Sequence, residues 1–387
     1  MWRHFCMVVF SAGALFTMAD IGVSAEAARK YRVYIGTYTG PGSRGIYQTT
    51  LDVATGQLLP AQLAAEIVSP SFLAIHPSQK YLYAVNEVTE FENKPTGAVT
   101  AFAIDENTGA LRALNQQPSE GTHPCHLIVD AAGKNVLVAN YTSGSVAVLP
   151  IDPASGRIAA ASSKVQHAGS SINKQRQEGP HAHSINLDAA NRFALVADLG
   201  LDAVKIYRFD SAAAALAPHT AEGVVAKGGG PRHLAFHPSG KFAFVNNELS
   251  STVTVFRYDS TNGSLVETHT LSTLPTGFTG ENSTAETAVH PTGNAVYVSN
   301  RGHDSIAVFS FDSNSGMLTA KGHTATGGKT PRNFAIEPTG AFLLAANQTT
   351  NTIVVFRIDP TSGGLTDTGV KIEVGSPVCI RFLPLKS

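Results

Sequence analysis

The sequence predicts an all-β fold, a seven-bladed β-propeller closed by N-terminal strands that pair with the C-terminal strand. Three observations predict this fold. Charged residues make up only 15% of the 387 residues, while 35 glycines and 20 prolines punctuate the chain, a composition typical of short strands and turns. A strand pattern recurs roughly every 51 residues, near the period of propeller blades. The two chain ends carry complementary parts of one repeat.

Each repeat begins at a proline or its substitute and continues through two alternating strands to an asparagine. The repeats begin at Pro70, Pro124, Pro180, Pro231, Thr284, Pro331 and Pro377. In four repeats a glycine precedes the asparagine by seven residues, as Gly240 precedes Asn247. This constant spacing fixes the strand register, because a slip of one residue would invert every side chain.

A third strand follows in each repeat, at residues 145–149, 203–207, 252–256, 305–309 and 352–356 among others. It ends in a turn in which an Asp side chain caps the backbone and a Gly supplies positive φ, as in Asp259 and Gly263. Six turns are regular, and Asp210 begins a degenerate seventh. Seven turns favour seven blades over an eight-bladed ring or a pair of β-sandwiches.

The chain ends predict how the ring closes. Residues 377–384 form a first strand with nothing after it, whereas 31–37 and 45–51 form second and third strands with nothing before them. We expect residues 378–382 to pair with 31–37, because this pairing completes one blade and removes the open sheet edge.

Charge and cysteine content exclude several classes of protein. The net charge of −1 provides no basic field for nucleic acid or an anionic membrane. The three cysteines, Cys6, Cys125 and Cys379, have no zinc-ligand spacing and are too few for a disulfide framework. We expect no metal, no cofactor and no nucleic-acid partner, and a monomer in which Cys125 is a buried thiol rather than a nucleophile.

Residues 1–27 have the layout of a secretory signal peptide. Arg3 lies in the basic start, an apolar run covers residues 5–18, and small-residue cleavage sites lie near Ala25 or Ala27. The run is short and mixed for a membrane span, and an uncleaved anchor is the alternative. We expect the mature chain, residues 28–387, to be one soluble propeller domain, periplasmic or secreted, with no membrane attachment.

Two rings of residues are predicted at one mouth of the central channel. The first ring follows the repeat proline and holds Ser71, Cys125, His183, Arg232, Ala285, Arg332 and Val378. The second follows the repeat asparagine and holds Thr37, Glu87, Tyr141, Leu199, Glu248, Arg301 and Gln348. Core packing does not require charges where sister blades carry Ser, Ala or Val, and burying charges is costly unless they pair. The concentration of Arg, Glu and His side chains in these two rings indicates a functional site.

The segment from Gln177 to His183 is two residues longer than its sisters, and we expect this insertion to form a bulge beside the site. Its two histidines, His181 and His183, have three interpretations: metal ligands, structural hydrogen-bonding groups, or acid–base and substrate-binding residues. No further metal-ligand motif accompanies them.

Other polar residues of the repeats divide into scaffold and candidate positions. His76, His237 and His290 recur at one repeat position, which indicates a scaffold role. Asp198 replaces the repeat asparagine and is either structural or functional. Glu286 occupies the position of His126, His233 and Asn333 in sister blades, as a channel residue or as a partner for Arg301 or Arg332. The candidate substrate-binding residues are His181, Arg332, Glu286, His233 and Asp198.

Several of these segments resemble the lactonase family of seven-bladed propellers. They are Gly230–Pro238, Asn247–Val253, Ser299–Ile306, Pro180–His183 and Ala197–Gly200. The family includes a bacterial 6-phosphogluconolactonase and the fungal 3-carboxy-cis,cis-muconate lactonizing enzyme, and the likeness covers essentially the whole mature chain. In the muconate-lactonizing relatives a His, a Glu and two Arg lie at the channel mouth. By motif they correspond to His183 (or His181), Glu248, Arg232 and Arg301.

The resemblance implies a 6-phosphogluconolactonase-like hydrolase of a sugar-acid lactone, with a small-molecule lactone or carboxylate as substrate. Glu248 or His183 would be the general base, with the other as proton shuttle. Arg232 and Arg301 would bind a carboxylate, a phosphate or the oxyanion, and Arg332 a second anionic group. The 6-phosphogluconolactonase of this family is cytosolic, whereas the present sequence carries a predicted export signal.

Two alternative functions are open on the sequence. A muconate-type lactonizing cycloisomerase would use the same four side chains, and the reaction product would distinguish it from a hydrolase. A non-enzymatic extracytoplasmic propeller would bind a protein or glycan, since the fold alone specifies no activity. The charged mouth favours an enzyme, because a scaffold would more often use its rim loops.

Overall fold

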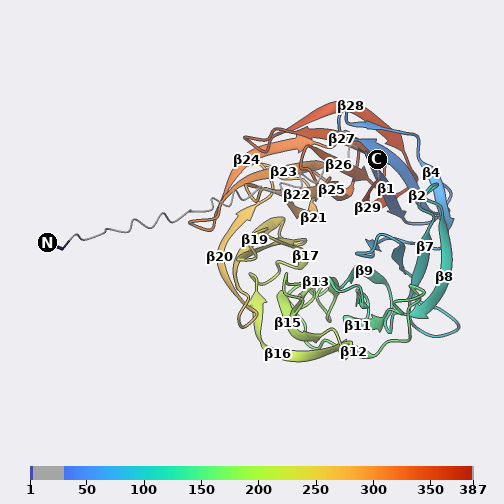
Figure 1. Ribbon diagram of the computed structural model, residues 1–387. Helices are drawn as coiled ribbons and strands as arrows, with labels where there is room; N and C mark the ends of the chain where they lie inside the picture. Colours follow the sequence, from blue (N-terminus) through green and yellow to red (C-terminus); the bar gives the residue numbers. More distant parts are fainter. Residues whose placement is uncertain (3–29, 386–387) are drawn as a thin grey trace.

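Seven antiparallel β-sheets lie as blades around a central axis in the computed structural model, which describes residues 1–2 and 30–385 (Figure 1). Every strand in this part of the chain pairs within one blade, and the described residues contain no helix. None of them therefore forms a helix of the length and hydrophobicity that a membrane span needs. The predicted all-β, seven-bladed architecture is confirmed, while the signal peptide predicted for residues 1–27 falls almost wholly outside the described residues.

The blades are numbered here in chain order. Blade 1 contains β5 (Leu73–Ile75), β6 (Tyr81–Asn86), β7 (Ala98–Ile104) and β8 (Leu111–Pro118). Blade 2 contains β9 (Pro124–Val129), β10 (Asn135–Asn140), β11 (Ser145–Pro150) and β12 (Ser163–Gln166). Blade 3 contains β13 (Ala182–Leu187), β14 (Phe193–Asp198), β15 (Ala203–Asp210) and β16 (Ala215–Val224). Blade 4 contains β17 (Pro231–Phe236), β18 (Phe242–Asn247), β19 (Thr252–Asp259) and β20 (Ser264–Ser272).

The remaining blades follow the same order from the axis outward. Blade 5 contains β21 (Ser283–Val289), β22 (Ala295–Arg301), β23 (Ser305–Asp312) and β24 (Met317–Ala325). Blade 6 contains β25 (Pro331–Ile336), β26 (Phe342–Asn347), β27 (Thr352–Ile358) and β28 (Leu365–Glu373). Blade 7 contains β29 (Pro377–Pro384), β1 (Lys30–Thr37), β2 (Gly45–Asp52), β3 (Gln57–Leu58) and β4 (Gln62–Glu66), with β3 and β4 both pairing with β2.

Blade 7 closes the ring with strands from both chain ends. The C-terminal strand β29 is innermost and pairs antiparallel with β1, from Tyr31 opposite Pro384 to Thr37 opposite Pro377. This pairing confirms the predicted closure. It matters for stability because an unpaired β1 or β29 would expose a row of backbone hydrogen-bonding groups.

The turns after the third strands explain why the repeats keep their register. In blade 4, Gly263 N donates to Asp259 O at 2.8 Å, and Gly263 has a φ of +73° that favours glycine. The degenerate turn of blade 3 folds in the same way without a glycine. Asp210 Oδ1 accepts from the amides of Ala212 and Ala213, and Ala214 takes a φ of +49°. The seventh turn is therefore structurally complete.

Hydrogen bonds across blade boundaries position neighbouring blades. His237 bonds Ser239 Oγ through Nδ1 at 2.7 Å and the carbonyl of Gly293 in the next blade through Nε2 at 3.2 Å. His76 and His290 make the same pair of contacts in their own blades, which supports the scaffold role predicted for all three. Tyr83 likewise donates its buried hydroxyl to Gly156 O in the next blade, at 2.9 Å.

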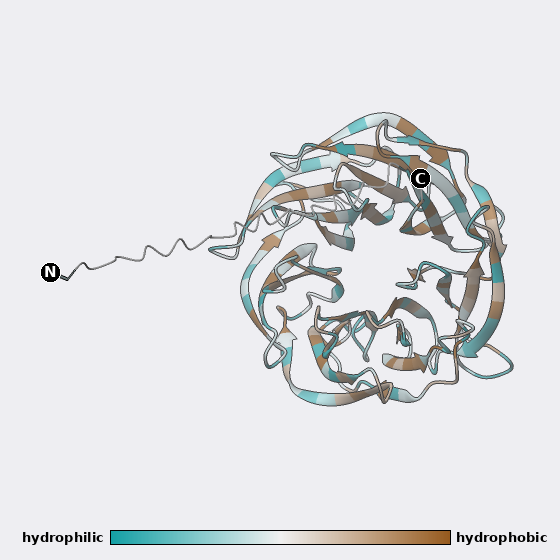
Figure 2. Cartoon of the chain, viewed as in Figure 1, coloured by the Kyte–Doolittle hydropathy of each residue, from teal (hydrophilic) through white to brown (hydrophobic). Residues whose placement is uncertain are grey.

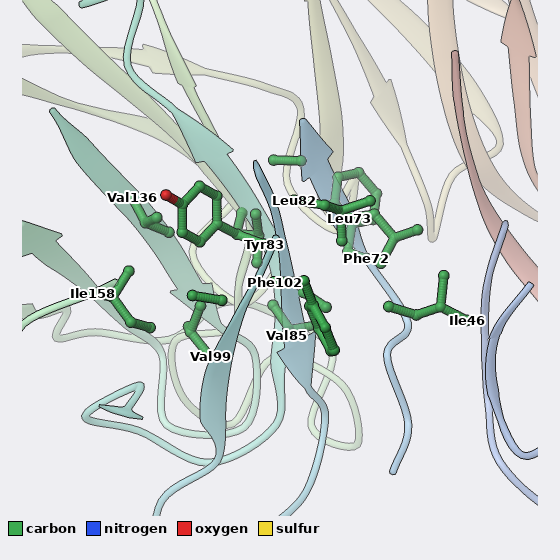
Figure 3. Close-up of a cluster of buried hydrophobic side chains, with 14 of the residues drawn as sticks. Ile46, Phe72, Leu73, Leu82, Tyr83, Val85, Val99, Phe102, Val136 and Ile158 are labelled. Carbon is green, nitrogen blue, oxygen red and sulfur yellow. The ribbon is translucent and has the colours of Figure 1, made fainter. Parts of the chain in front are cut away.

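The hydrophobic core lies between adjacent blades. At the boundary of blades 1 and 2, Tyr83 and Val99 pack with Val136 and Ile158, whereas Phe102 on the other face of blade 1 lies toward Ile46 of blade 7 (Figure 3). Figure 2 shows hydrophobic residues along the inner strands, with more hydrophilic residues toward the periphery. Each large apolar side chain buried in this way contributes about 1.5–3 kcal/mol, so the blades are held mainly by their faces.

A β-bulge near the start of the innermost strand recurs around the ring and positions the site. It places one extra residue opposite the end of the second strand in six blades. In blade 3 that residue is His183 and in blade 4 it is Arg232. The bulge predicted at His183 is thus present, but the two-residue insertion does not cause it. The insertion lies ahead of β13, where Ala182 rather than Pro180 takes the place of the repeat proline.

Candidate active site

Side chains from the bulges and from the ends of the second strands meet at one mouth of the central channel. A cavity of about 10 Å³, roughly the room that one water molecule needs, lies among them. Its lining residues are Tyr38, Ser71, Phe72, Glu87, Cys125, His183, Arg232, His233, Arg332 and Val378. All members of the predicted first ring except Ala285 are in this set.

Glu248 anchors a cluster of three arginines beside the cavity. Its Oε2 accepts a hydrogen bond from Arg232 Nε and lies near Arg301 Nη2, each at 2.9 Å, while Oε1 accepts from Arg176 Nη2 at 2.7 Å. Burial raises the pKa of this carboxyl, but the charges of Arg301 and Arg232 outweigh burial and hold the pKa far below its usual range. The ionised carboxylate is a poor proton acceptor and a strong positioning group.

Two of these arginines also bind backbone carbonyls of blade 5. Arg232 Nη1 donates to Ala285 O, and Arg301 Nη2 donates to Thr284 O at 2.8 Å. Burial lowers the pKa of Arg301 to about 9, which leaves it charged at neutral pH. These contacts hold both guanidinium groups in place, although Arg301 Nε is buried without a hydrogen-bond partner among the described residues.

His183 is a neutral imidazole facing the cavity. Its Nδ1 lies 3.8 Å from Cys125 Sγ, and its ring packs edge-on against His233 with centroids 5.3 Å apart. Burial, with the charge of Arg232, lowers the pKa of His183 well below its usual range. Among the described residues, no polar side chain is bonded to its Nε2. Burial also raises the pKa of the Cys125 thiol, which agrees with a buried, protonated cysteine.

Arg332 differs from the other arginines of the site because its guanidinium makes no hydrogen bond or ion pair within the described residues. It lies over the ring of Tyr38, with 5.4 Å from Cζ to the ring centroid. The Tyr38 hydroxyl donates to Glu87 at 2.9 Å, and Ser71 Oγ also donates to Glu87. Glu87 is thus the carboxylate of the cavity wall and balances part of the charge of Arg332.

A further polar cluster extends from the cavity wall at His233. His233 Nδ1 bonds Glu286 Oε1 at 2.8 Å, and Asn333 Nδ2 donates to Glu286 Oε2. Glu286 therefore pairs with His233, not with Arg301 or Arg332 as the sequence had also allowed. His126 packs on Phe72 in the same cluster, with ring centroids 4.2 Å apart.

Two predicted site residues lie away from the cavity. The Asp198 carboxylate accepts from the backbone amides of His181 and Gly200 and from His167 Nδ1, the last at 2.5 Å. This geometry favours the structural interpretation of Asp198. His181 stacks on Tyr141 with centroids 4.6 Å apart and lies outside the cavity wall. In residues 1–2 and 30–385, no group of three or more His, Cys, Asp or Glu side chains has an arrangement that could hold a metal ion.

Three residues of the site were not among the predicted catalytic and substrate-binding residues, although Glu87 was a member of the second predicted ring. Glu87 was detectable, because it occupies in blade 1 the second-ring position that Glu248 occupies in blade 4. Tyr38 follows the ring residue Thr37 directly. Arg176 had no signal in the repeat pattern, since it lies in the insertion between β12 and β13.

A wider hollow of about 1060 Å³ lies elsewhere, between blades 7, 1 and 2. Its lining includes Arg32, Lys80, Arg112 and Arg157 and contains no histidine. It therefore lacks the combination of imidazole, carboxylate and arginine found at the channel mouth, where acid–base chemistry is better supported.

Comparisons with known proteins agree with this architecture. The family model described as "Lactonase, 7-bladed beta-propeller" matches residues 32–382. A 6-phosphogluconolactonase of Bacillus subtilis is 38% identical over 79% of this chain and 84% of its own length. One from Formosa agariphila is 36% identical over 78% and 85%. A periplasmic gluconolactonase structure from Pseudomonas aeruginosa aligns with a TM-score of 0.85 at 32% identity, covering 92% of this chain and 100% of that one.

Proposed function

The chain belongs to the lactonase family of seven-bladed β-propellers, and from this premise we propose that it hydrolyses a sugar-acid lactone at the channel mouth. The observation that carries the proposal is the convergence of His183, Arg232 and Arg332 on one cavity, with Glu248 and Arg301 directly behind. Hydrolysis needs a proton acceptor for water and donors for the developing oxyanion, and this set provides both.

His183 is the proposed general base. A water molecule attacks the lactone carbonyl carbon while His183 Nε2 takes its proton. The tetrahedral intermediate then collapses, the bond from carbon to ring oxygen breaks, and the imidazolium returns the proton to that oxygen. The products are a free hydroxyl and a carboxylic acid, which ionises. The lowered pKa of His183 keeps the imidazole neutral, and so able to accept a proton, at neutral pH.

Arg332 is the proposed oxyanion ligand. Its donors have no partner among the described residues, whereas Arg232 and Arg301 each contact Glu248 and donate to a backbone carbonyl. A cation–π contact with Tyr38 holds the guanidinium group over the aromatic ring. Glu248 acts through the arginines as a positioning residue, and this role replaces the general-base role considered for it from the sequence.

The test is a lactone panel at controlled pH, with acid release followed by titration. Glucono-δ-lactone and 6-phosphoglucono-δ-lactone should be hydrolysed faster by the wild-type protein than by His183→Gln. Product identification separates hydrolysis from cycloisomerisation, since only hydrolysis consumes water. A protein that accelerates no lactone in the panel would contradict the proposal and favour the binding-scaffold interpretation.

We also propose export to the periplasm by the signal peptide expected at residues 1–27. The basic start, apolar run and small-residue cleavage sites support this proposal, as does the similarity to a periplasmic gluconolactonase. Cell fractionation with N-terminal sequencing tests it. We expect a soluble periplasmic protein that begins at Glu26 or Ala28, and an uncleaved cytoplasmic chain would contradict the proposal.

A further inference from the structure

An arm inserted between blades 2 and 3 contacts the site through Arg176. It consists of residues 168–180, between β12 and β13, and we call it the insertion arm. The corresponding segments of neighbouring blades are shorter, as at residues 119–123, 225–230 and 326–330. The repeat fold therefore does not require an arm of this length, and the additional residues need another explanation.

The insertion arm is held in one conformation by buried polar contacts. Asp202 accepts hydrogen bonds from Ser171 Oγ at 2.5 Å and from Gln177 Nε2 at 2.6 Å, and Gln177 also donates to Leu199 O at 2.9 Å. Packing is close as well, since a Cβ atom on Gly200 would lie 1.9 Å from Gly179 O. The arm is thus docked on the turn after β14, and the side chains it carries have defined positions.

Arg176 is the side chain that the arm delivers to the site. Its Nη2 donates to Tyr141 Oη at 3.1 Å and to Glu248 Oε1 at 2.7 Å, and 42% of the side chain is exposed. Its Nε and Nη1 groups donate to no atom of the described residues. Arg176 is therefore the solvent-facing member of the arginine cluster, with unused donors toward the entrance.

The wall of the cavity carries more positive than negative charge. Arg232 and Arg332 line it beside one carboxylate, Glu87, while Glu248, Glu286 and Glu178 balance part of the arginine charge from outside the wall. The neighbouring His183 is neutral. An excess of positive charge in a largely buried site is stabilised when the ligand brings negative charge.

We infer that Arg176 is a specificity-determining residue, which binds an anionic oxygen group of the substrate, a phosphate or a carboxylate, remote from the lactone carbonyl. The inference rests on the proposed function and deepens it. With the lactone ring against His183 and Arg332, the far end of a sugar-acid substrate extends toward the entrance, where the free donors of Arg176 lie. A charge-assisted contact there separates anionic from neutral lactones.

The test measures binding of three open-chain acids by calorimetry: 6-phosphogluconate, glucarate and gluconate. The first two carry a phosphate or a carboxylate at the far end, and gluconate carries a hydroxyl. We expect the wild-type protein to bind at least one of the first two about tenfold or more tightly than gluconate, as one added charge-assisted hydrogen bond provides. Whichever acid gains this affinity identifies the anionic group.

Arg176→Ala should reduce that preference to less than about threefold, and Arg176→Lys should restore part of it because the charge returns without the planar fork. Lys174→Ala is the matched control, since Lys174 is an exposed cation of the same arm with no polar contact within the described residues. It should keep the full preference.

The inference is overturned if the wild-type protein shows no preference for a doubly anionic acid, if Arg176→Ala retains the preference, or if Lys174→Ala loses it equally. An equal loss of affinity for all three acids in Arg176→Ala also overturns it, because that result indicates general damage to the site. An Arg176-dependent preference in a protein that hydrolyses no lactone would support the specificity role and contradict only the proposed hydrolase.

Discussion

Arg232 Nε donates to Glu248 Oε2 at 2.9 Å within one blade, between side chains that are only 2% and 6% exposed. The register explains the pair, because Pro231 and Asn247, their neighbours in sequence, are paired residues of β17 and β18. The bulge at Arg232 directs the guanidinium group toward the carboxylate that follows β18. The central ion pair of the site is therefore set by a local strand connection.

Glu248→Gln should cut kcat/KM about 100-fold or more and lower the free energy of unfolding by about 3–5 kcal/mol, the usual result of removing one partner from a buried ion pair. The amide keeps the shape of the side chain but leaves Arg232 and Arg301 close together without a balancing charge. Steady-state kinetics and urea unfolding measure the two effects. Glu373→Gln, at an exposed end of β28, is the control and should change neither. Near-full turnover in a folded Glu248→Gln protein would contradict this role.

His183→Gln should lower kcat by about 100-fold or more, the scale of a lost general base, whereas His181→Gln should lower it less than about tenfold. The structural reason is that His183 lines the cavity while His181 stacks on Tyr141 outside it. Steady-state kinetics on both variants decides between the two histidines. The opposite ranking of the variants would assign the base to His181.

The pH profile provides a separate check on His183. Because the pKa of His183 lies well below about 6.5, the imidazole stays unprotonated as the pH falls through neutrality. The kcat/KM of the wild-type protein should therefore be level from pH 8 to below 6.5 and decline only in more acidic buffer. A decline centred at pH 6.5 or higher would show that a different group is the base.

The fold and much of the site could be predicted because the repeat supplies a frame of reference. The turn from Asp259 to Gly263 can be recognised from local sequence, and the seven occurrences of this turn pattern give the number of blades. Once the blades are in register, residues at equivalent positions lie around one mouth of the central channel. Arg232 and Glu248 could therefore be placed near each other, but the hydrogen bond between them could not be predicted.

What escaped prediction lies outside that frame. Arg176 reaches the site through an insertion whose conformation depends on contacts to Asp202, and no repeat position encodes such contacts. The partner of Glu286 also required coordinates, because the sequence suggested Arg301 or Arg332 and the structure pairs Glu286 with His233. Pairing within a ring of charges depends on side-chain directions that spacing does not specify.

Arg332→Lys should lower kcat about tenfold or more with a smaller change in KM, because an oxyanion ligand acts mainly in the transition state. Lysine keeps the charge but loses the planar group that stacks over Tyr38. Arg332→Ala should lower kcat further. Arg357→Lys is a suitable control, since Arg357 covers Phe342 at the opposite, outer part of blade 6 in a similar stacking contact. An increase in KM alone would indicate ground-state binding by Arg332.

Deletion of residues 375–387 should abolish cooperative unfolding, because it removes β29 and exposes the edges of β1 and of the neighbouring blades. Urea unfolding followed by circular dichroism measures this effect. The control is a circular permutant that joins residue 385 to residue 30 and opens the turn at residues 260–263. The joined ends are adjacent, since Leu385 N donates to Lys30 O at 3.0 Å. The permutant should unfold cooperatively, and cooperative unfolding of the deletion variant would contradict the closure argument.

Acid should destabilise the protein in two steps. Burial lowers the pKa of His126 and His183 well below their usual value of about 6.5, so below that pH the unfolded chain binds protons that the folded chain does not. The free energy of unfolding should therefore fall as the pH drops from about 6.5. Below about pH 4.5 a second loss follows, because Glu248 and Glu286 have lowered pKa values and the unfolded carboxyls protonate first.

Urea midpoints measured from pH 8 to pH 3 test both steps. In His126→Phe, which keeps an aromatic ring against Phe72, the first loss should be shallower than in the wild-type protein because one titrating group is gone. The variant should also be less stable at pH 8, since the amide of Ile185 loses the His126 Nδ1 acceptor at 3.3 Å. Stability that is constant or rises as the pH falls from 6.5 to 5 would show that these histidines take up protons in the folded state.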